Sequence, residues 1–233
     1  MKKLHRGGSS PDGEPLSAGR VEYLEAARQR VRRRRLRRTA ILLAALILVT
    51  LFATGAVGAS IARVKDLVDT VHIALSPAVG WPQQTGLGDL TAVQPMSGSF
   101  AAMDEDACVV YSLGGTRLAG IQSGYARPAL AAGKTRFVLY NRSGNELRVE
   151  SRTQNLYSKT LENSIYLCAM SDTGTLAVAT DSADSTARLT VYTPTMTEQL
   201  HWDMTGTQGT PVRMAFAADS RRLAVATVTS SAG

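Results

Sequence analysis

Acidic residues are the first candidates for chemistry in this chain, because they gather in two short stretches. Asp104-Glu105-Asp106 is the densest cluster, and Asp181, Ser182 and Asp184 form a looser one. Oxygen-rich clusters suit hard cations such as Ca²⁺. Adjacent residues of a strand or turn point in different directions, however, so these side chains diverge. We therefore expect two solvated turns and no metal site.

The histidines and cysteines do not complete a site either. His5, His72 and His201 fall in three separate regions, without the spacing of metal ligands. Cys108 and Cys168 each lie in an apolar run typical of a strand, where an unpaired cysteine behaves as a small buried side chain. A disulfide between them is the alternative, since an oxidising compartment would permit it. We expect two buried free thiols.

Common catalytic motifs are absent from the sequence. It contains no Gly-x-Ser-x-Gly, no His-Glu-x-x-His and no phosphate-binding loop. Trp81 and Trp202 could line a ligand site, but packing between sheets is the simpler role for such large aromatic side chains. The sequence therefore predicts no catalytic, cofactor-binding or metal-binding residues, and a protein that is not an enzyme.

Positive charge is concentrated at the N-terminal end. The net charge is +7, but residues 1–39 hold 12 basic and 4 acidic residues, whereas 14 basic and 15 acidic residues follow from Arg63 onward. A nucleic-acid-binding domain would carry its basic residues on the folded part. Because the remainder of this chain is close to neutral, we expect no nucleic-acid partner.

Residues 39–62 form an uncharged, largely apolar stretch of 24 residues between Arg38 and Arg63. A helix of this length reaches about 36 Å, enough to cross a hydrocarbon core of about 30 Å. The arginine-rich tail 1–38 precedes it, and the positive-inside rule places that tail in the cytoplasm. We predict a single-pass protein of the plasma membrane, with the lipid bilayer as a partner and the remainder of the chain extracellular.

A cleaved signal peptide is the alternative interpretation of this stretch. Val57-Gly58-Ala59 offers the small residues that a signal peptidase prefers, and cleavage would release a secreted domain. The apolar part of a signal peptide is about 7–15 residues long, however, which is shorter than the stretch found here. We therefore expect an uncleaved anchor.

Residues 63–79 are expected to leave the membrane as a short helix. Ser76-Pro77 ends it, because a residue before proline avoids the helical conformation. Apolar residues recur at steps of three and four and would share one face. That face could join two copies as a dimeric stalk, but it covers fewer than two heptads, so we expect it to pack on its own domain or along the membrane. The stripe comprises Val64, Leu67, Val68, Val71 and Leu75.

Internal repeats dominate residues 80–233. Residues 109–118 align without gaps to residues 138–147, 29 positions later, with matching Tyr, Gly and Leu. Residues 172–180 match residues 219–227, 47 positions later, and both contain Leu-Ala-Val-Ala-Thr. Each copy indicates a strand, a turn and a second strand, in which glycine or aspartate forms the turn.

Four short strands in each period of about 40–45 residues are typical of a β-propeller blade. A β-sandwich could imitate the strand count, but it would not predict the repeated turns headed by Asp172 and Asp219. We therefore predict one transmembrane α-helix followed by an all-β domain over residues 80–233, a partial β-propeller of about three blades. Closed propellers have about 4–8 blades, so we also expect the sequence to be truncated.

Several segments besides the predicted signal-anchor and the two aspartate turns carry a family resemblance: 80–82, 124–128, 147–152 and 189–192. With them the chain resembles an uncharacterised family of Gram-positive (Firmicutes-type) single-pass membrane proteins that have a WD40-like or PQQ-like propeller. The resemblance covers about residue 80 to the end. It implies the fold and the topology, and it implies no functional residues.

These features together predict a membrane-anchored, extracytoplasmic binding or scaffold module. Its expected partner is a cell-envelope protein, peptide or glycan, which it holds without catalysis. The alternative is a sensor or an enzyme whose active groups lie in further blades. Acidic or histidine clusters that converge at the ends of blades would favour the alternative, and plain turn residues would favour the binding module.

Overall fold

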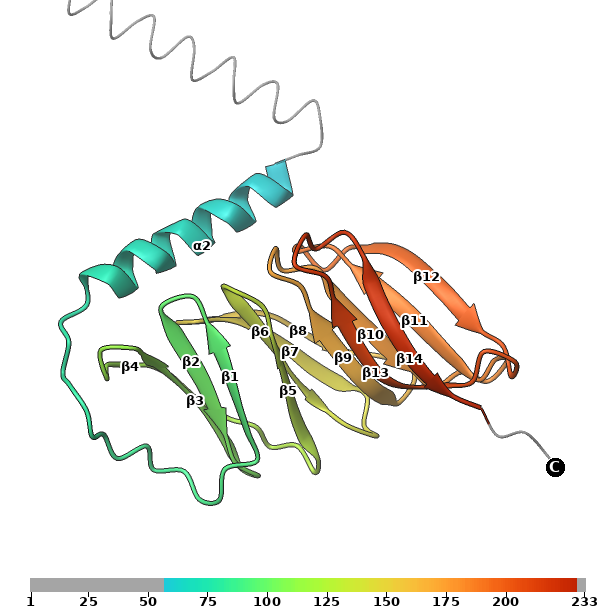
Figure 1. Cartoon of the computed structure of the whole chain (residues 1–233), viewed down its shortest axis with the longest axis horizontal. Coiled ribbons are helices and arrows are strands. Elements are labelled where there is room, and N and C mark those ends of the chain that lie inside the picture. Colours follow the sequence, from blue (N-terminus) through green and yellow to red (C-terminus); the bar gives the residue numbers. More distant parts are fainter. Residues whose placement is uncertain (1–56, 230–233) are drawn as a thin grey trace, which may run out of the picture. The chain divides into compact units, whose positions relative to one another are not determined.

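The computed structural model describes residues 57–229, in which a helix precedes a series of short strands (Figure 1). The tail predicted at 1–38 and nearly all of the span predicted at 39–62 lie outside these residues. Within the described part, no helix is both long enough and apolar enough to cross a membrane.

Helix α2 (Val57–Leu75) ends where the sequence predicts, directly before Ser76 and Pro77. The Ser76 hydroxyl donates a hydrogen bond of 2.8 Å to the carbonyl oxygen of His72 and so satisfies one of the last open carbonyl groups. The helix runs from Val57, so it spans the boundary that the sequence analysis set between the apolar stretch 39–62 and the segment 63–79.

The apolar stripe of α2 faces solvent, which contradicts the expectation that it packs on its own domain. The opposite face of the helix is the one in contact, since Asp69 and Ile73 are each 8% exposed. The polar face of the helix contacts the ends of the blades, because side chains there form hydrogen bonds with the helix. The exposed fractions along the stripe are 58% for Val64, 63% for Leu67, 60% for Val68, 50% for Val71 and 79% for Leu75.

Three four-stranded antiparallel sheets follow the helix, each with its strands in chain order, and we call them blades 1 to 3. Blade 1 consists of β1 (Ala92–Met96), β2 (Ser99–Met103), β3 (Ala107–Ser112) and β4 (Arg117–Gln122). Blade 2 consists of β5 (Pro128–Ala132), β6 (Arg136–Asn141), β7 (Glu146–Ser151) and β8 (Asn155–Thr160). Blade 3 consists of β9 (Ile165–Met170), β10 (Leu176–Thr180), β11 (Ala187–Tyr192) and β12 (Glu198–Met204).

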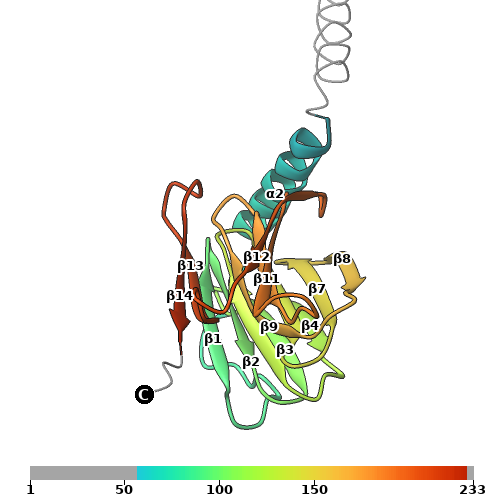
Figure 2. The ribbon, with the colours of Figure 1, turned by 90° about the vertical axis from the view of Figure 1, so that its right-hand side faces the viewer.

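A two-stranded sheet, which we call the terminal hairpin, completes the described chain with β13 (Thr210–Phe216) and β14 (Leu223–Val228). The first strands of successive sheets lie against one another: β1 contacts β5, β5 contacts β9, and β9 contacts β13 (Figure 1). Figure 2 shows the same sheets from the side on which the terminal hairpin lies. Sheets that meet through their first strands and stack face to face give a propeller-like, all-β arrangement.

One of the two predicted repeats is a repeat of the blade, and the other is not. The turns headed by Asp172 and Asp219 join β9 to β10 and β13 to β14, which are equivalent places in successive sheets. Residues 109–118 and 138–147 do form hairpins, but they join β3 to β4 in blade 1 and β6 to β7 in blade 2. The predicted hairpins are therefore confirmed, but they stand at different places in their blades, because any glycine turn between two apolar strands gives the same pattern.

Strand β6 shows how the core is shared. Phe137 and Leu139 belong to the apolar cluster between blades 1 and 2, whereas Val138 and Tyr140 belong to the cluster between blades 2 and 3. Successive side chains of a strand point to opposite faces, so β6 is buried on both sides. This double burial explains why its sequence is a continuous apolar run rather than an alternating one.

The cysteines lie in two different clusters, as free buried thiols. Cys108 is in the cluster between blades 1 and 2, and Cys168 is in the cluster between blades 2 and 3. Burial raises the pKa of Cys108 from 9.0 to about 12 and raises the pKa of Cys168 well above its ordinary value. The structure therefore agrees with the prediction of two unpaired cysteines.

Trp81 packs on the outer face of blade 1 rather than between blades, which corrects the expectation for this residue. Its ring lies 5.7 Å from the ring of Phe100 and 5.6 Å from the ring of Tyr111, and its Nε1 donates to the carbonyl oxygen of Leu113. The Tyr111 hydroxyl in turn donates to the carbonyl oxygen of Gln84. The segment between α2 and β1 thus covers one face of blade 1.

Two arginines of blade 2 hold α2 and the neighbouring blades together. Arg136 is 2% exposed, and its Nε donates to Asp66 of α2 at 3.0 Å while its Nη1 donates to the carbonyl oxygen of Pro194 in blade 3. Arg152 is 1% exposed, and it donates to the Thr70 hydroxyl of α2 and to the carbonyl oxygen of Ser97 in blade 1. Each guanidinium therefore joins three elements, and we call the pair the arginine staples.

Removing the charge of Asp66 should destabilise the fold. In Asp66→Asn, the guanidinium of Arg136 loses its carboxylate partner at a site nearly closed to solvent, which costs about 2–4 kcal/mol and lowers the melting temperature by roughly 5–12 °C. Circular dichroism of the full chain in detergent measures the melting temperature. Asp89→Asn, at an exposed aspartate, is the matched control, and equal melting temperatures of the two variants would contradict this account.

The cysteines should resist alkylation until the chain unfolds. With a pKa of about 12, Cys108 is almost wholly protonated at pH 9, whereas a thiol with a pKa of 9.0 is half ionised. We expect iodoacetamide to modify both cysteines at least about 100-fold more slowly in the native chain than in guanidinium chloride, as measured by mass spectrometry. Because the unfolded chain releases these protons first, stability should also fall as the pH rises above about 9. Rapid labelling of the native chain would disprove the burial.

Candidate functional site

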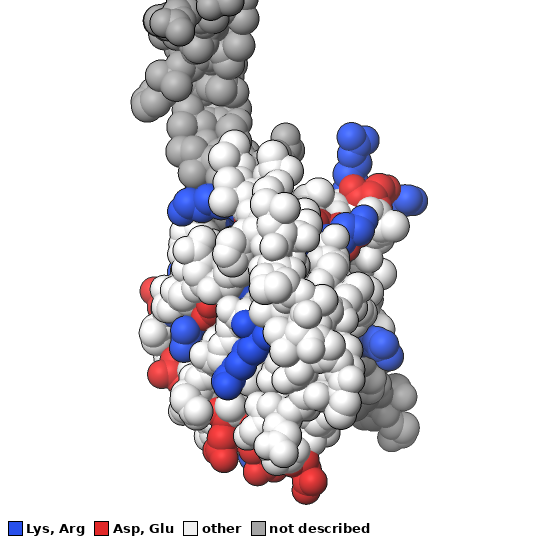
Figure 3. All heavy atoms as spheres, turned by 90° about the vertical axis from the view of Figure 1, so that its left-hand side faces the viewer, with Lys and Arg blue, Asp and Glu red and all other residues white. Residues whose placement is uncertain are grey.

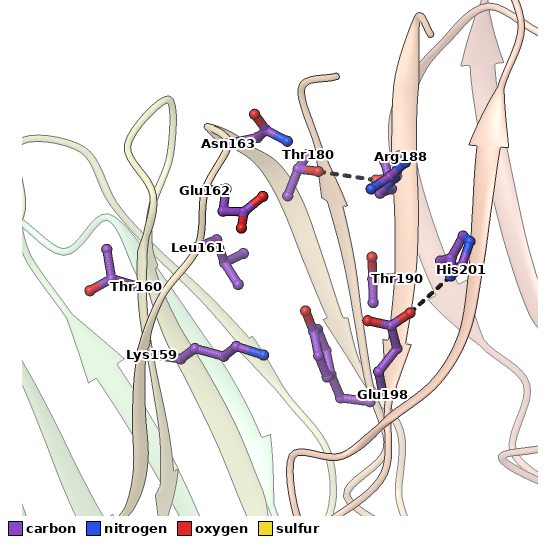
Figure 4. A pocket seen from close by; sticks show the side chains of 11 residues that line it. Lys159, Thr160, Leu161, Glu162, Asn163, Thr180, Arg188, Thr190, Glu198 and His201 are labelled. Carbon is purple, nitrogen blue, oxygen red and sulfur yellow. Dashed lines mark hydrogen bonds and ion pairs between the residues drawn. The ribbon is translucent and has the colours of Figure 1, made fainter. Parts of the chain in front are cut away.

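A groove between blades 2 and 3 is the main candidate site. Its volume is about 310 Å³, and it opens between the end of β8 and the outer strands β11 and β12 (Figure 4). An apolar cluster packs the two blades together, and it extends from Ala129 and Ile165 of the first strands to Tyr157 of β8 and Tyr192 of β11. The groove lies beside the outer part of this cluster.

Blade 3 supplies one wall through three pairs of facing residues. In the register of β11 and β12, Arg188 faces Asp203, Thr190 faces His201, and Tyr192 faces Glu198. Residues that face each other in an antiparallel pair lie on the same side of the sheet. Because side chains alternate between the two faces along β11, Arg188, Thr190 and Tyr192 all point toward blade 2. The residues that face them on β12 lie on the same side of the sheet.

Blade 2 supplies the other wall from the end of β8 and the linker that follows it. Lys159 reaches across the groove, with its Nζ 4.3 Å from the centre of the Tyr192 ring, a distance at which the cation and the ring attract each other. Leu161 is held by Asn145, whose backbone carbonyl accepts from the Leu161 amide and whose side chain donates to the Leu161 carbonyl. Glu162 and Asn163 complete this rim.

Charged side chains of the groove are mostly paired with one another. Arg188 Nε lies 2.6 Å from Asp203 Oδ1, and this hydrogen bond raises the pKa of Arg188 and holds the pKa of Asp203 below its ordinary value. His201 Nδ1 lies 2.8 Å from Glu198 Oε1. A groove whose charges are largely balanced suits a ligand with little net charge and many hydrogen-bonding groups.

The acidic clusters singled out in the sequence are turn residues in the structure. Asp104 accepts hydrogen bonds from the backbone amides of Gly88, Asp106 and Ala107, and these bonds hold its pKa below the ordinary value. Asp181 accepts from the Tyr166 hydroxyl. Among the described residues, no group of three or more histidine, cysteine or acidic side chains could hold a metal ion.

The two aspartates of the repeated turns have different partners. Asp219 accepts from the backbone amide of Arg221, as the sequence predicts for an aspartate that bonds to its own turn. Asp172 instead pairs with Lys134 of blade 2 at 2.9 Å. Both are structural residues, and neither lines the groove.

Of the histidines and Trp202, which the sequence analysis singled out, one of the described residues lines the groove. His201 lines the groove, His72 is exposed on α2, and His5 lies outside the described residues. Trp202 is 45% exposed and faces Leu189 across the strand pair, on the side of blade 3 that looks toward the terminal hairpin. Sequence reasoning missed the groove itself, although the alternation of residues 187–192 predicted the strand that forms its wall.

The surface shows no continuous basic patch on the face drawn in Figure 3, where the described lysines and arginines are scattered among uncharged residues. Acidic side chains gather at one end of that face (Figure 3). Nucleic-acid binders concentrate basic side chains over the surface that contacts phosphate. The expectation that the chain has no nucleic-acid partner stays a prediction.

Antiparallel four-stranded sheets that stack through their first strands define a propeller-like protein, with a polar groove between two of its blades. The chain belongs to a family of unknown function, DUF5711, whose model matches residues 79–233. No curated protein matches the sequence.

Solved structures with propeller-like folds are distantly similar. Hsv2 of Kluyveromyces marxianus is 13% identical with a TM-score of 0.49, and the match covers 59% of this chain and 44% of that one. The WD40 domain of Pan2 from Neurospora crassa is 12% identical with a TM-score of 0.36, covering 49% and 36%. Regucalcin, a calcium-binding protein of Agrobacterium tumefaciens, is 13% identical with a TM-score of 0.39, covering 58% and 52%. This chain thus spans about half of these structures or less, and the likeness concerns the fold alone.

Proposed function

We propose that this chain is a membrane-tethered binding module of the cell envelope, which holds an extended, polar ligand in the groove between blades 2 and 3. The groove itself carries the proposal, because a volume of about 310 Å³ accepts a few residues of a peptide or a few sugar rings. Its lining combines an aromatic ring, hydroxyl groups and balanced charges, which recognise hydrogen-bonding groups rather than net charge.

A non-catalytic role is supported by the chemistry of the groove residues. His201 is the imidazole in the lining, and it is paired with Glu198 while both side chains are about half exposed. A site for nucleophilic catalysis would place an activated side-chain nucleophile beside that imidazole. The hydroxyl of Thr180 donates to the Arg188 carbonyl, and Thr190 faces His201 as a cross-strand neighbour. We propose that these groups bind and orient a ligand.

The tether is proposed from the sequence. The uncharged stretch 39–62 follows a tail with 12 basic residues, so the positive-inside rule directs residues after the stretch out of the cell. An extracellular domain next to the bilayer would meet envelope glycans and peptides. A groove for polar, nearly neutral ligands fits that location.

Protease treatment of protoplasts tests the topology. With one tag at each end of the full chain, we expect the protease to remove the C-terminal tag while the N-terminal tag stays protected until detergent is added. A protected C-terminal tag would reverse the proposed orientation. A C-terminal tag recovered from the medium would show a secreted domain and refute the tether.

Substitution of Arg188 tests the groove. We expect the full chain in detergent to bind purified cell-wall glycan strands or wall stem peptides, as measured by titration calorimetry. Arg188→Ala should weaken that binding about tenfold or more, because a charged hydrogen-bonding group is worth about 1.5–3 kcal/mol.

Arg222→Ala is the matched control for this experiment. Arg222 forms the same kind of exposed ion pair, with Asp219 at 3.0 Å, but it lies in the turn of the terminal hairpin and outside the groove. We expect its affinity to equal that of the unaltered chain. Equal effects of the two substitutions would place binding elsewhere, and no binding of either probe would refute an envelope ligand of this chemistry.

A further inference from the structure

Helix α2 carries a seam of apolar residues with the spacing of a coiled coil. Once the helix is seen to begin at Val57, the seam extends through Ile61 and covers the whole helix at alternating steps of four and three. This spacing matches the a and d positions of a heptad repeat. The seam residues are Val57, Ile61, Val64, Val68, Val71 and Leu75, and the last four are each at least half exposed.

The opposite face of α2 is already occupied by the protein's own domain. Asp66 bonds to Arg136, the Thr70 hydroxyl accepts from Arg152, and Asp69 Oδ1 accepts from the Thr153 hydroxyl at 2.8 Å. These residues, with the buried Ile73, are the b, c and f positions of the same heptads. The domain thus binds the back of the helix and leaves Val64, Val68, Val71 and Leu75 of the seam exposed.

Residues that flank the seam do not oppose self-association. In a parallel pair, each g residue lies near the e residue of the following heptad on the partner. Here the neighbouring pairs are Ser60 with Lys65 and Leu67 with His72. Neither pair brings two charges of the same sign together. The aspartates of the helix lie on the docked face, away from this contact.

A membrane surface is the other apolar partner that a helix face can meet. Helices that lie in the plane of a bilayer carry lysine and arginine on their polar face and often use aromatic residues on the apolar one. The helix contains two basic residues, Arg63 and Lys65, but its polar face presents Asp66 and Asp69 to its own domain, and its one aromatic ring is that of His72. These features favour a protein partner over lipid.

We infer that α2 associates with α2 of a second copy of this chain, in parallel and in register, through the a and d seam. The parallel direction follows from the proposed tether, which orients all copies alike. Each propeller-like domain then lies on the outside of the pair, because it is bound to the back of its helix. Self-association is independent of what the groove between blades 2 and 3 binds.

Cysteine cross-linking on the full chain in its membrane tests this inference. Cys108 and Cys168 are buried, so a short bismaleimide reaches an engineered thiol selectively. Val68→Cys, at an a position, should give a covalent dimer. Leu113→Cys lies in the turn between β3 and β4, where Leu113 is 66% exposed, and should give at least about tenfold less. Equal cross-linking of the two would reflect random collision and overturn the inference.

A second set of variants separates this seam from other contacts between copies. Adding Val64→Ser and Val71→Ser to Val68→Cys should reduce the cross-linked dimer about tenfold, with the melting temperature unchanged because both valines are exposed. Undiminished cross-linking would place the association outside α2 and overturn the inference. A fluorophore at position 68 that is quenched by spin-labelled lipid, without cross-linking, would place the seam on the bilayer and overturn it as well.

Discussion

Arg136 and Arg152 bring two positive charges to the ends of the blades, where almost no solvent reaches them. Such charges are tolerated only when their donors meet acceptors in fixed geometry. The planar guanidinium group can donate hydrogen bonds to acceptors in several fixed directions at once. A lysine ammonium on a flexible stem does not fix the directions of its hydrogen bonds in the same way. The acceptors come from α2, from the β1–β2 turn and from the β11–β12 turn, so two side chains of one blade determine how four elements are arranged.

The groove depends on that arrangement. Near the centre, the apolar cluster between blades 2 and 3 keeps β5, β6 and β9 together. Toward the outside, β11 and β12 carry polar pairs, and Lys159 of blade 2 contacts the Tyr192 ring of blade 3 across the groove. A packed inner part fixes the shape of the groove. In the lining, Glu198 and His201 are about half exposed, whereas Thr190 and Tyr192 are buried.

The sequence predicted the strands, the aspartate turns, the buried cysteines and the end of α2, all of which follow from local periodicity and turn chemistry. It did not predict the arginine staples, because Arg136 and Asp66 are 70 positions apart and only the tertiary fold joins them. Tyr192 and Lys159 likewise meet across two blades. The apolar stripe of α2 was expected to pack on its own domain or along the membrane, and the first alternative was wrong, since periodicity identifies a face but does not say which face the rest of the protein occupies.

Docking of α2 by side chains also has a mechanical consequence. The segment from Ser76 to Thr91 connects the helix to blade 1 along the chain, but Asp66 bonds to blade 2 ahead of that connection. A pulling force applied at Val57 would therefore act on the ion pair between Asp66 and Arg136 before it stretches the connecting segment. Blade 2, in the middle of the stack, would carry the strain first, and β1, the first strand of blade 1, would be shielded from being peeled away.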